Sequence, residues 1–255
     1  MERHLLVTVS EKHDNLFGVR FLGNFFAKKE EMKVTLLYLT PKPPGRFEAD
    51  PEMELRAKKS EAIGRKALNE AKGELMKTGF KDEQVFLKIR PSRLSKVNEI
   101  IQEGSDGKYD AVVLGRRGLS RLEQTFDESV TSTLFEQEWG FPLWICRKHD
   151  PERHHVLACV DGSDASHRML DHVGFVLGQA LNQDVTLLAI SRKGNVGEKT
   201  VEEILSKSKG ILVADGISAE RIHSKVIPET DAAKAIIKEA GSEHFAAVAV
   251  GRTGK

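Results

Sequence analysis

Short apolar runs alternate with longer stretches of helical periodicity through the first half of the chain. The apolar runs predict strands at residues 4–9, 33–39, 84–89, 110–115 and 141–146. The stretches between them predict helices near residues 14–30, 53–78, 93–105 and 129–138. Because long helical segments separate the strands, this pattern favours a parallel sheet with right-handed crossovers and helices on both faces. Proline-rich Thr40–Pro51 predicts an exposed loop.

The second half of the chain repeats the first half. His4–Leu39 aligns on His155–Ile190 without a gap, at an offset of 151 residues. Further along, Ile100–Gly118 aligns on Ile236–Gly254 at an offset of 136 residues, so the second copy lacks 15 residues in its middle. Self-similarity over this length indicates that one structural unit occurs twice.

The repeat predicts two α/β domains, at residues 1–147 and 153–255. A polar junction, RKHDPERHH, lies between them and contains the helix breaker Pro151. Each copy is expected to be an open parallel sheet with helices on both faces. The sequence stops at Lys255, before the last helix and the last strand of the second copy, so either the chain is part of a longer one or this copy is truncated.

Composition narrows the partners that the chain is expected to have. Its 39 basic and 38 acidic residues nearly cancel, so no net field attracts nucleic acid or a membrane, and neither partner is expected. The sequence contains no apolar run long enough to span a bilayer and no signal-peptide core, which predicts a cytoplasmic protein. Cys146 and Cys159 are expected to pack as small hydrophobic side chains rather than to form a redox pair.

A glycine-bracketed segment, GRTGK at Gly251–Lys255, follows the last apolar run and suggests a phosphate-binding loop. It is not a Walker loop, because only two residues separate Gly251 from Gly254 where four are needed, and no Ser or Thr follows Lys255. The dinucleotide fingerprint also fails, since its first spacing is wrong and its third glycine is missing. In an open α/β sheet, ligands bind beyond the carboxyl ends of the strands, where the strand order reverses.

VLACVDGSDAS in the second copy, together with VAVGRTG and the tandem repeat, resembles the universal stress protein family over essentially the whole chain. The resemblance implies a five-stranded parallel sheet of order 3-2-1-4-5 in each copy. In nucleotide-binding members of that family, an Asp that closes strand one holds the adenine. A Gly-x₂-Gly-x₉-Gly-Ser/Thr motif after strand four wraps the ribose and the phosphates. The implied cofactor is ATP or AMP, and no metal is expected apart from nucleotide-associated Mg²⁺.

The resemblance places any competent nucleotide site in the second copy. The residues expected to line it are Asp161, Gly162, Ile190, Gly251, Arg252 and Gly254. The glycines would allow the backbone to approach phosphate oxygens closely, and a helix N-terminus beyond them would favour the negative charge. The Gly-Ser pair that should follow is absent, because the sequence stops at Lys255.

The corresponding site in the first copy is expected to be degenerate. Ser10 stands where the Asp should be. Gly115, Gly118 and Ser129 have the family spacing, but Glu128 replaces the glycine before Ser129. A carboxylate facing the phosphates at about 4 Å would cost on the order of 4 kcal/mol at an effective dielectric constant near 20.

Simpler readings of these segments remain open at this point. The turn Asp161–Asp164 is also explained as a helix start, with Ser163 or Asp164 as the N-cap. Arg116 and Arg117 are also typical of a solvated loop. The junction histidines His149, His154 and His155 have no carboxylate or cysteine at metal-ligand spacing.

Three classes of function follow from these observations. The first is a nucleotide-binding regulatory or stress-response protein, and the second is an interaction scaffold that binds no nucleotide. The third, an adenine-nucleotide hydrolase, has the least support, because no nucleophile and base stand at convincing positions; no catalytic residue is predicted, and at most slow ATP hydrolysis is expected.

Protein partners cannot be named from the sequence, but self-association is expected. The apolar strand Phe141–Arg147 would leave an open edge. This edge predicts either a homodimer or a pseudo-dimer of the two domains.

Overall fold

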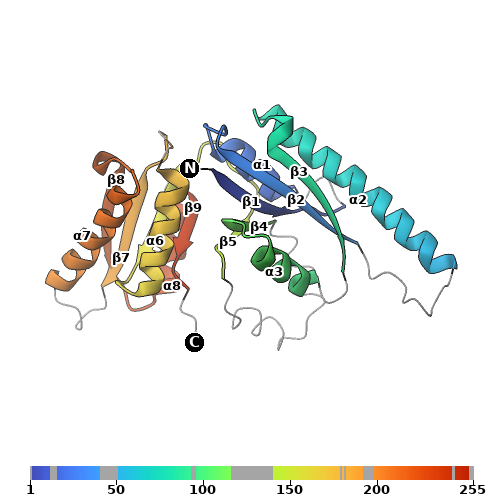
Figure 1. The fold of residues 1–255 in the computed structure, drawn as a ribbon. Coiled ribbons are helices and arrows are strands. Elements are labelled where there is room, and N and C mark those ends of the chain that lie inside the picture. The colour runs from blue at the N-terminus through green and yellow to red at the C-terminus, as the bar shows by residue number, and fades with distance from the viewer. Residues whose placement is uncertain are drawn as a thin grey trace. The chain divides into compact units, whose positions relative to one another are not determined.

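The computed structural model describes residues 2–11, 16–40, 51–92, 96–115, 140–178, 180, 182–191, 198–242 and 245–252. The chain divides into two compact units, Met1–His149 and Asp150–Lys255 (Figure 1). Predictions that concern Gly118, Glu128, Ser129, Gly254 or the helix at 129–138 lie outside the described residues.

The first unit contains a five-stranded sheet of order β3-β2-β1-β4-β5. All of its strand pairs are parallel. Its elements are β1 (Arg3–Thr8), α1 (Phe17–Phe25), β2 (Met32–Thr40), α2 (Pro51–Lys77), the 3₁₀ turn η2 (Asp82–Gln84), β3 (Val85–Pro91), α3 (Lys96–Asp106), β4 (Ala111–Gly115) and β5 (Leu143–Cys146). Helices α1 and α2 lie on one face of the sheet and α3 lies on the other (Figure 1). The predicted fold class is confirmed here.

The second unit contains a four-stranded parallel sheet of order β8-β7-β6-β9. Its elements are β6 (His155–Val160), α6 (Asp164–Leu177), β7 (Val185–Ser191), α7 (Glu198–Ala214), the 3₁₀ turn η3 (Ala219–Arg221), β8 (Ile222–Pro228), α8 (Ala232–Ser242) and β9 (Phe245–Val250). This order matches β3-β2-β1-β4 of the first unit, so the two units share their strand order over the described residues.

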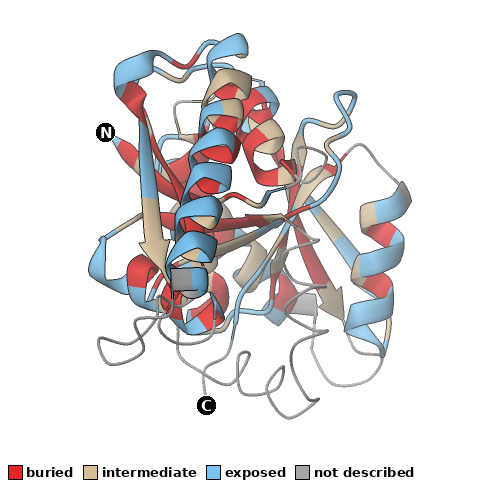
Figure 2. Ribbon diagram, turned by 90° about the vertical axis from the view of Figure 1, so that its right-hand side faces the viewer, coloured by how far each residue is buried: buried red, intermediate tan, exposed pale blue. Residues whose placement is uncertain are grey.

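Apolar sequence runs account for the central strands. Every residue of β4 from Ala111 to Leu114 is at most 4% exposed, because helices cover both faces of this strand. Buried positions concentrate on the strands and on the helix faces turned toward them (Figure 2). On the α3 side, Ile100 packs with Leu6 and Leu37 in one core cluster.

The same helix-ending motif occurs in both units. In the first unit, the N–H of Phe80 donates to the carbonyl of Leu75, and the N–H of Gly79 donates to the carbonyl of Met76. Gly79 has a positive φ of 100°. This is the Schellman pattern, which satisfies carbonyls at a helix end. Gly216, with a φ of 92°, closes α7 in the same way.

One predicted helix is shorter in the structure. The helix predicted at 14–30 is observed as α1, Phe17–Phe25, and residues 12–15 lie outside the described part. Phe26 is extended, with φ −92° and ψ 119°, and it is 3% exposed. Its ring stacks on Trp144 of β5, with the ring centroids 6.1 Å apart. The apolar pattern continued past Phe25 because of this tertiary contact and not because the helix continues.

Both cysteines are free thiols inside the units. Cys146 is buried and Cys159 is half-buried. Burial raises the pKa of each thiol to about 12. They pack as small hydrophobic side chains, as expected, and are not reactive thiolates at neutral pH.

Candidate functional site

A three-residue turn joins β6 to α6 and contains the first of the predicted site residues. Ser163 is the N-cap of α6, with an extended backbone at φ −73° and ψ 159°. Its hydroxyl oxygen accepts a hydrogen bond from the backbone N–H of Ser166 at 3.2 Å. This bond satisfies one of the N–H groups that the first turn of a helix leaves free. The structure therefore assigns the cap to Ser163 rather than to Asp164.

The carboxylate of Asp161 is held by the same serine. Its Oδ1 accepts hydrogen bonds from the backbone N–H of Ser163 at 2.9 Å and from the Ser163 hydroxyl at 2.6 Å. Partial burial raises the pKa of Asp161, but hydrogen bonds from Ser163 and Ser166 outweigh burial and hold this pKa below its usual value of 3.8. Since Asp161 is exposed, the turn presents an ionised carboxylate to solvent at the carboxyl end of β6.

Gly162 gives the turn its shape. Its φ is 80°, in the left-handed region that favours glycine. A Cβ at this position would lie 2.9 Å from Cγ1 of Ile204 on α7. Contact with α7 and the hydrogen bonds of Ser163 therefore both hold the turn in place. A side chain at position 162 would clash with Ile204 and displace the turn.

Gly251 brings the second predicted loop against the first. β9 pairs with β6, and Gly251 follows the end of β9. A Cβ on Gly251 would lie 2.6 Å from the backbone N of Ser166 and 2.6 Å from the carbonyl carbon of Ala165. The chain after β9 therefore starts in contact with the first turn of α6. This close approach, rather than a ligand, is the visible reason for glycine at position 251.

Two other predicted residues of the second unit, Ile190 and Arg252, have no hydrogen bond with the Asp161 turn among the described residues. Ile190 is half-buried near the end of β7 and packs against the core cluster of Leu157, Leu188 and Phe245. Arg252 is exposed just after Gly251. The structure thus brings together the Asp161 turn and Gly251, while Ile190 lies in the hydrophobic core on the next strand.

The first unit has a different arrangement at the end of its first strand. Among the described residues, the buried Oγ of Ser10 has no hydrogen-bond partner. Glu11 Oε1 accepts a hydrogen bond from the Tyr38 hydroxyl at 3.0 Å. Burial, together with Glu11, raises the pKa of Tyr38 to about 12. Gly115 is half-buried at the end of β4.

Sequence reasoning missed the Tyr38–Glu11 pair, although the repeat contained a signal for it. Tyr38 aligns on Ala189, and Glu11 aligns on Gly162. The first copy therefore has a tyrosine and a carboxylate at positions where the second copy has two small residues. This difference indicated that the two strand ends would differ in structure.

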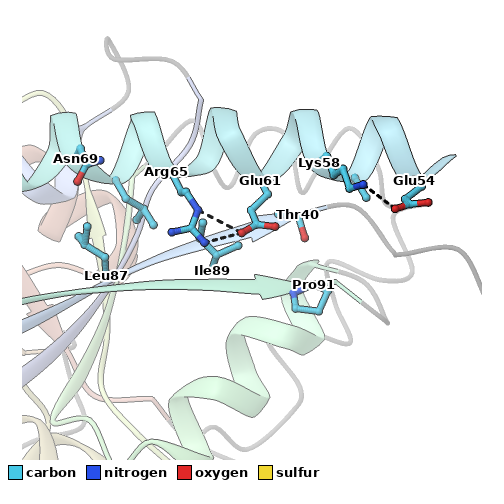
Figure 3. Close-up of a pocket in the computed structure, with 11 residues that line it drawn as sticks. Thr40, Glu54, Lys58, Glu61, Arg65, Asn69, Leu87, Ile89 and Pro91 are labelled. Carbon is cyan, nitrogen blue, oxygen red and sulfur yellow. Dashed lines mark hydrogen bonds and ion pairs between the residues drawn. The ribbon is translucent and has the colours of Figure 1, made fainter. Parts of the chain in front are cut away.

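An open pocket of about 620 Å³ lies between α2 and the carboxyl ends of β2 and β3 (Figure 3). Two ion pairs along α2 form one wall, Lys58–Glu54 and Arg65–Glu61, each with a closest distance of 2.7 Å. Leu87, Ile89 and Pro91 face them from β3. The ion pairs are solvent-exposed, so they contribute little stability and satisfy the charges of one another. This pocket was not predicted from the sequence. The greater length of α2, 27 residues against 17 in α7 of the second unit, could have indicated it.

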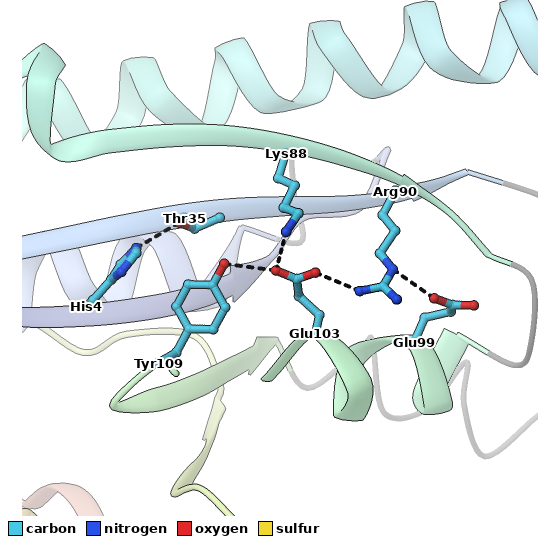
Figure 4. Close-up of polar contacts among 7 residues, drawn as sticks. All are labelled: His4, Thr35, Lys88, Arg90, Glu99, Glu103 and Tyr109. Carbon is cyan, nitrogen blue, oxygen red and sulfur yellow. Dashed lines mark hydrogen bonds and ion pairs between the residues drawn. The ribbon is translucent and has the colours of Figure 1, made fainter. Parts of the chain in front are cut away.

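A buried charge network joins α3 to β3 in the first unit (Figure 4). Glu103 accepts hydrogen bonds from Lys88 at 2.6 Å, Arg90 at 2.8 Å and Tyr109 at 2.9 Å. Arg90 also pairs with Glu99 at 3.0 Å. The side chains of Glu99 and Glu103 are only 2% exposed.

The second unit keeps one pair of this network, Lys225–Glu239. Apolar residues replace other members of the network. Ile227 has the place of Arg90 in the strand register, because each pairs with the aligned residue of the neighbouring strand, Ile190 or Leu39. Ala235 and Phe245 align on Glu99 and Tyr109. Because each carboxylate in the network faces a cation, we interpret the network as structural.

Two further functional classes can be examined within the described parts of the chain. Across them, no group of three or more His, Cys, Asp or Glu side chains is arranged to hold a metal ion. None of the helices found there combines the length and the apolar character needed to cross a membrane.

Known proteins resemble this chain in sequence and in fold. Residues 1–137 match the model of the universal stress protein family. The crystal structure of a universal stress protein from Archaeoglobus fulgidus DSM 4304 is 20% identical to this chain. That match covers 96% of this chain and 83% of that protein, with a TM-score of 0.65. At this identity the likeness concerns the fold, and it extends over both units.

Two solved structures match a smaller part of the chain. A universal stress protein from Archaeoglobus fulgidus in complex with dAMP is 18% identical; the match covers 56% of this chain and 97% of that one, with a TM-score of 0.37. A universal stress protein in complex with cAMP is 16% identical, with 56% and 95% covered and a TM-score of 0.42. No curated protein matches the chain.

Proposed function

The chain belongs to the universal stress protein family, and we propose that it is a regulatory protein whose second unit binds an adenine nucleotide, ATP or AMP. One observation carries the proposal. The Asp161 turn and the Gly251 segment, which follow neighbouring parallel strands, meet at the first turn of α6. This is the edge of an open α/β sheet at which ligands bind.

The chemistry of this edge suits the two ends of a nucleotide. An ionised carboxylate at Asp161 is an acceptor for the exocyclic amine of adenine. The guanidinium of Arg252 is exposed just beyond Gly251 and adds a positive charge suited to phosphate.

A regulatory role fits better than an enzymatic one. The Asp161 carboxylate accepts the Ser163 hydroxyl, but its lowered pKa makes it a weak base for activating that hydroxyl as a nucleophile. Nucleotide occupancy would instead stabilise the Asp161 turn and the start of α6. Any partner that contacts those elements would then bind with a different affinity in the occupied state.

The first unit favours the second candidate function, an interaction scaffold that binds no nucleotide. Just after β1, Ser10 stands in place of the aspartate. The carboxylate of the next residue, Glu11, accepts a hydrogen bond from Tyr38. We therefore propose that the two units form a tandem of one nucleotide-binding domain and one degenerate domain.

Calorimetric titration with ATP, ADP and AMP tests the proposed function. Asp161→Ala should lower the affinity by about a hundredfold, because a charge-assisted hydrogen bond is lost. Ser10→Ala is the matched control at the aligned position of the first unit, and it should change the affinity little. At a nucleotide concentration 100 times the dissociation constant, the unmodified protein should gain about 2.7 kcal/mol of stability.

Two results would contradict the proposal. Greater sensitivity to Ser10→Ala would show that the second unit is not the competent one, and equal losses from both substitutions would show that the first unit is not degenerate. The absence of heat or of a thermal shift with any of the three nucleotides would leave the scaffold function.

A further inference from the structure

The pocket between α2 and the carboxyl ends of β2 and β3 has two dissimilar walls. One wall is apolar, because Leu87 and Ile89 of β3 and Leu68 of α2 line it. The other wall is formed by the two ion pairs on α2 (Figure 3). A cavity of about 620 Å³ is within the size range of small-molecule sites. The pocket therefore suits a ligand with an apolar body and a charged head.

Comparison with the second unit shows which parts of this pocket belong to the first unit alone. α2 and α7 both end two residues before the glycine of a Schellman motif, so the two helices can be aligned from that end. In this alignment α7 starts at Glu198, opposite Glu61. The earlier turns of α2, which carry Glu54 and Lys58, therefore have no counterpart in α7.

Two positions that both units share also differ in the pocket. Leu87 on β3 has the register position of Ser224 on β8. Arg65 on α2 aligns on Glu202 of α7. The first unit thus has an aliphatic side chain and a cation where the second has a hydroxyl and a carboxylate. Among the charges of the pocket that the second unit does not repeat, the cations Lys58 and Arg65 outnumber the carboxylates.

The guanidinium of Arg65 has N–H groups left for a second carboxylate. Its Nε and Nη2 both donate to Glu61 Oε1, at 3.2 and 2.7 Å. A guanidinium carries five N–H donors, so its outer edge, formed by Nη1 and Nη2, can hold another carboxylate in two parallel hydrogen bonds. The side chain of Arg65 is 70% exposed and extends from α2 toward β3, above the apolar wall (Figure 3).

We propose that this pocket binds an anionic amphiphile, a medium-chain carboxylate whose head binds Arg65 and whose alkyl chain lies on Leu87 and Ile89. The alkyl chain provides most of the affinity, because Leu87 is 42% exposed in the open pocket. The head group sets the orientation, since Glu61 already offsets part of the charge of Arg65. This site lies in the first unit, and its use does not depend on nucleotide binding by the second.

Calorimetric titration of the full chain with sodium decanoate, below the concentration at which it forms micelles, tests the proposal. The unmodified protein should bind one decanoate. Octanoate should bind roughly tenfold more weakly, because two methylene groups are lost from the apolar contact. Decylammonium has the same chain and the opposite charge, and it should bind at least about tenfold more weakly than decanoate.

Two substitutions give the pocket the side chains of the second unit. Arg65→Glu should weaken decanoate binding by about tenfold or more and remove the preference for decanoate over decylammonium. Leu87→Ser should weaken decanoate binding severalfold and retain that preference. Arg56→Glu is the matched control, because Arg56 pairs with Glu52 four positions earlier, as Arg65 does with Glu61, but does not line the pocket. It should leave every affinity unchanged. All three side chains are exposed, so the variants should fold.

Three results would overturn the proposal: no binding of decanoate, equal binding of decanoate and decylammonium, or a decanoate affinity that Arg65→Glu or Leu87→Ser leaves unchanged. Each of them leaves nucleotide binding by the second unit untouched. Asp161→Ala separates the two sites, since it should retain the full decanoate affinity while it loses nucleotide affinity. A loss of decanoate binding in Asp161→Ala would contradict a separate site in the first unit.

Discussion

The side chain of Glu103 extends from α3 toward β3, and three hydrogen-bond donors keep its carboxylate charged despite its burial. Burial raises the pKa of this carboxyl, but hydrogen bonds from Lys88, Arg90 and Tyr109 outweigh burial and hold the pKa below the ordinary value of 4.5. A carboxyl with a depressed pKa contributes stability that is present above its unfolded-state pKa and is lost as the pH falls through its folded-state pKa. We therefore expect the first unit to lose stability as the pH falls below about 4.5.

Glu103→Gln should reduce this pH dependence and should lower stability at pH 7 by about 1–3 kcal/mol, since buried donors lose a charged acceptor. Both tryptophans, Trp139 and Trp144, belong to the first unit. Urea denaturation followed by tryptophan fluorescence between pH 7 and pH 3 therefore reports on this unit. Glu83→Gln, at an exposed carboxylate, is the control and should have little effect. An unchanged acid dependence in Glu103→Gln would contradict this account.

α2 contains two glycines that the same substitution should affect in opposite directions. A Cβ on Gly64 would lie 2.4 Å from Cδ1 of the Tyr38 ring, whereas a Cβ on Gly73 would have no neighbour within 4 Å. Gly64→Ala should destabilise the first unit by about 1–3 kcal/mol, because the ring is buried and its hydroxyl is bonded to Glu11. Gly73→Ala should stabilise it by about 0.5–1 kcal/mol, since alanine favours the helix interior.

Urea denaturation at pH 7 measures both effects. Because the residue change and the helix are the same, the difference between the two variants isolates the contact with Tyr38. Equal stability changes would mean that the ring moves aside without cost and that the Tyr38–Glu11 pair does not hold it in place.

At the scale of the whole molecule, we expect the open sheet edges to govern self-association. Within the described residues, β5 pairs with β4 alone, and Ile145 on β5 is 47% exposed. An exposed apolar edge strand tends to pair with another strand. We predict a homodimer that forms through β5, and expect Ile145→Lys to convert it to a monomer in light scattering. Val226→Lys, at a residue 45% exposed on the edge strand β8, is the control and should leave the dimer intact.

A strict monomer at all concentrations would contradict the homodimer. If hydrogen exchange in β5 were slow in that monomer, the other expectation, coverage of this edge by the second unit, would be favoured. Fast exchange would contradict both forms of association.

Local features were predictable from the sequence because they depend on residues close together in the chain. The alternation of apolar runs with helical stretches predicted a parallel sheet with helices on both faces, and the burial of β4 agrees with it. The strand order 3-2-1-4-5 was implied by the family resemblance, and the sheet of the first unit has it. The turn at Asp161–Ser163 was recognisable as a helix start for the same reason. The bonds that close it join residues two or three positions apart.

The contacts that distinguish the two units depend on residues far apart in the chain. Tyr38 reaches Glu11 across 27 positions. Gly251 fits against Ala165 and Ser166 only because β9 pairs beside β6. A sequence pattern specifies the period of a strand and the cap of a helix. Which side chains meet is set by the register of the strand pairs and by the packing of helices on the sheet, so the residues that could close or open each site were decided by tertiary structure.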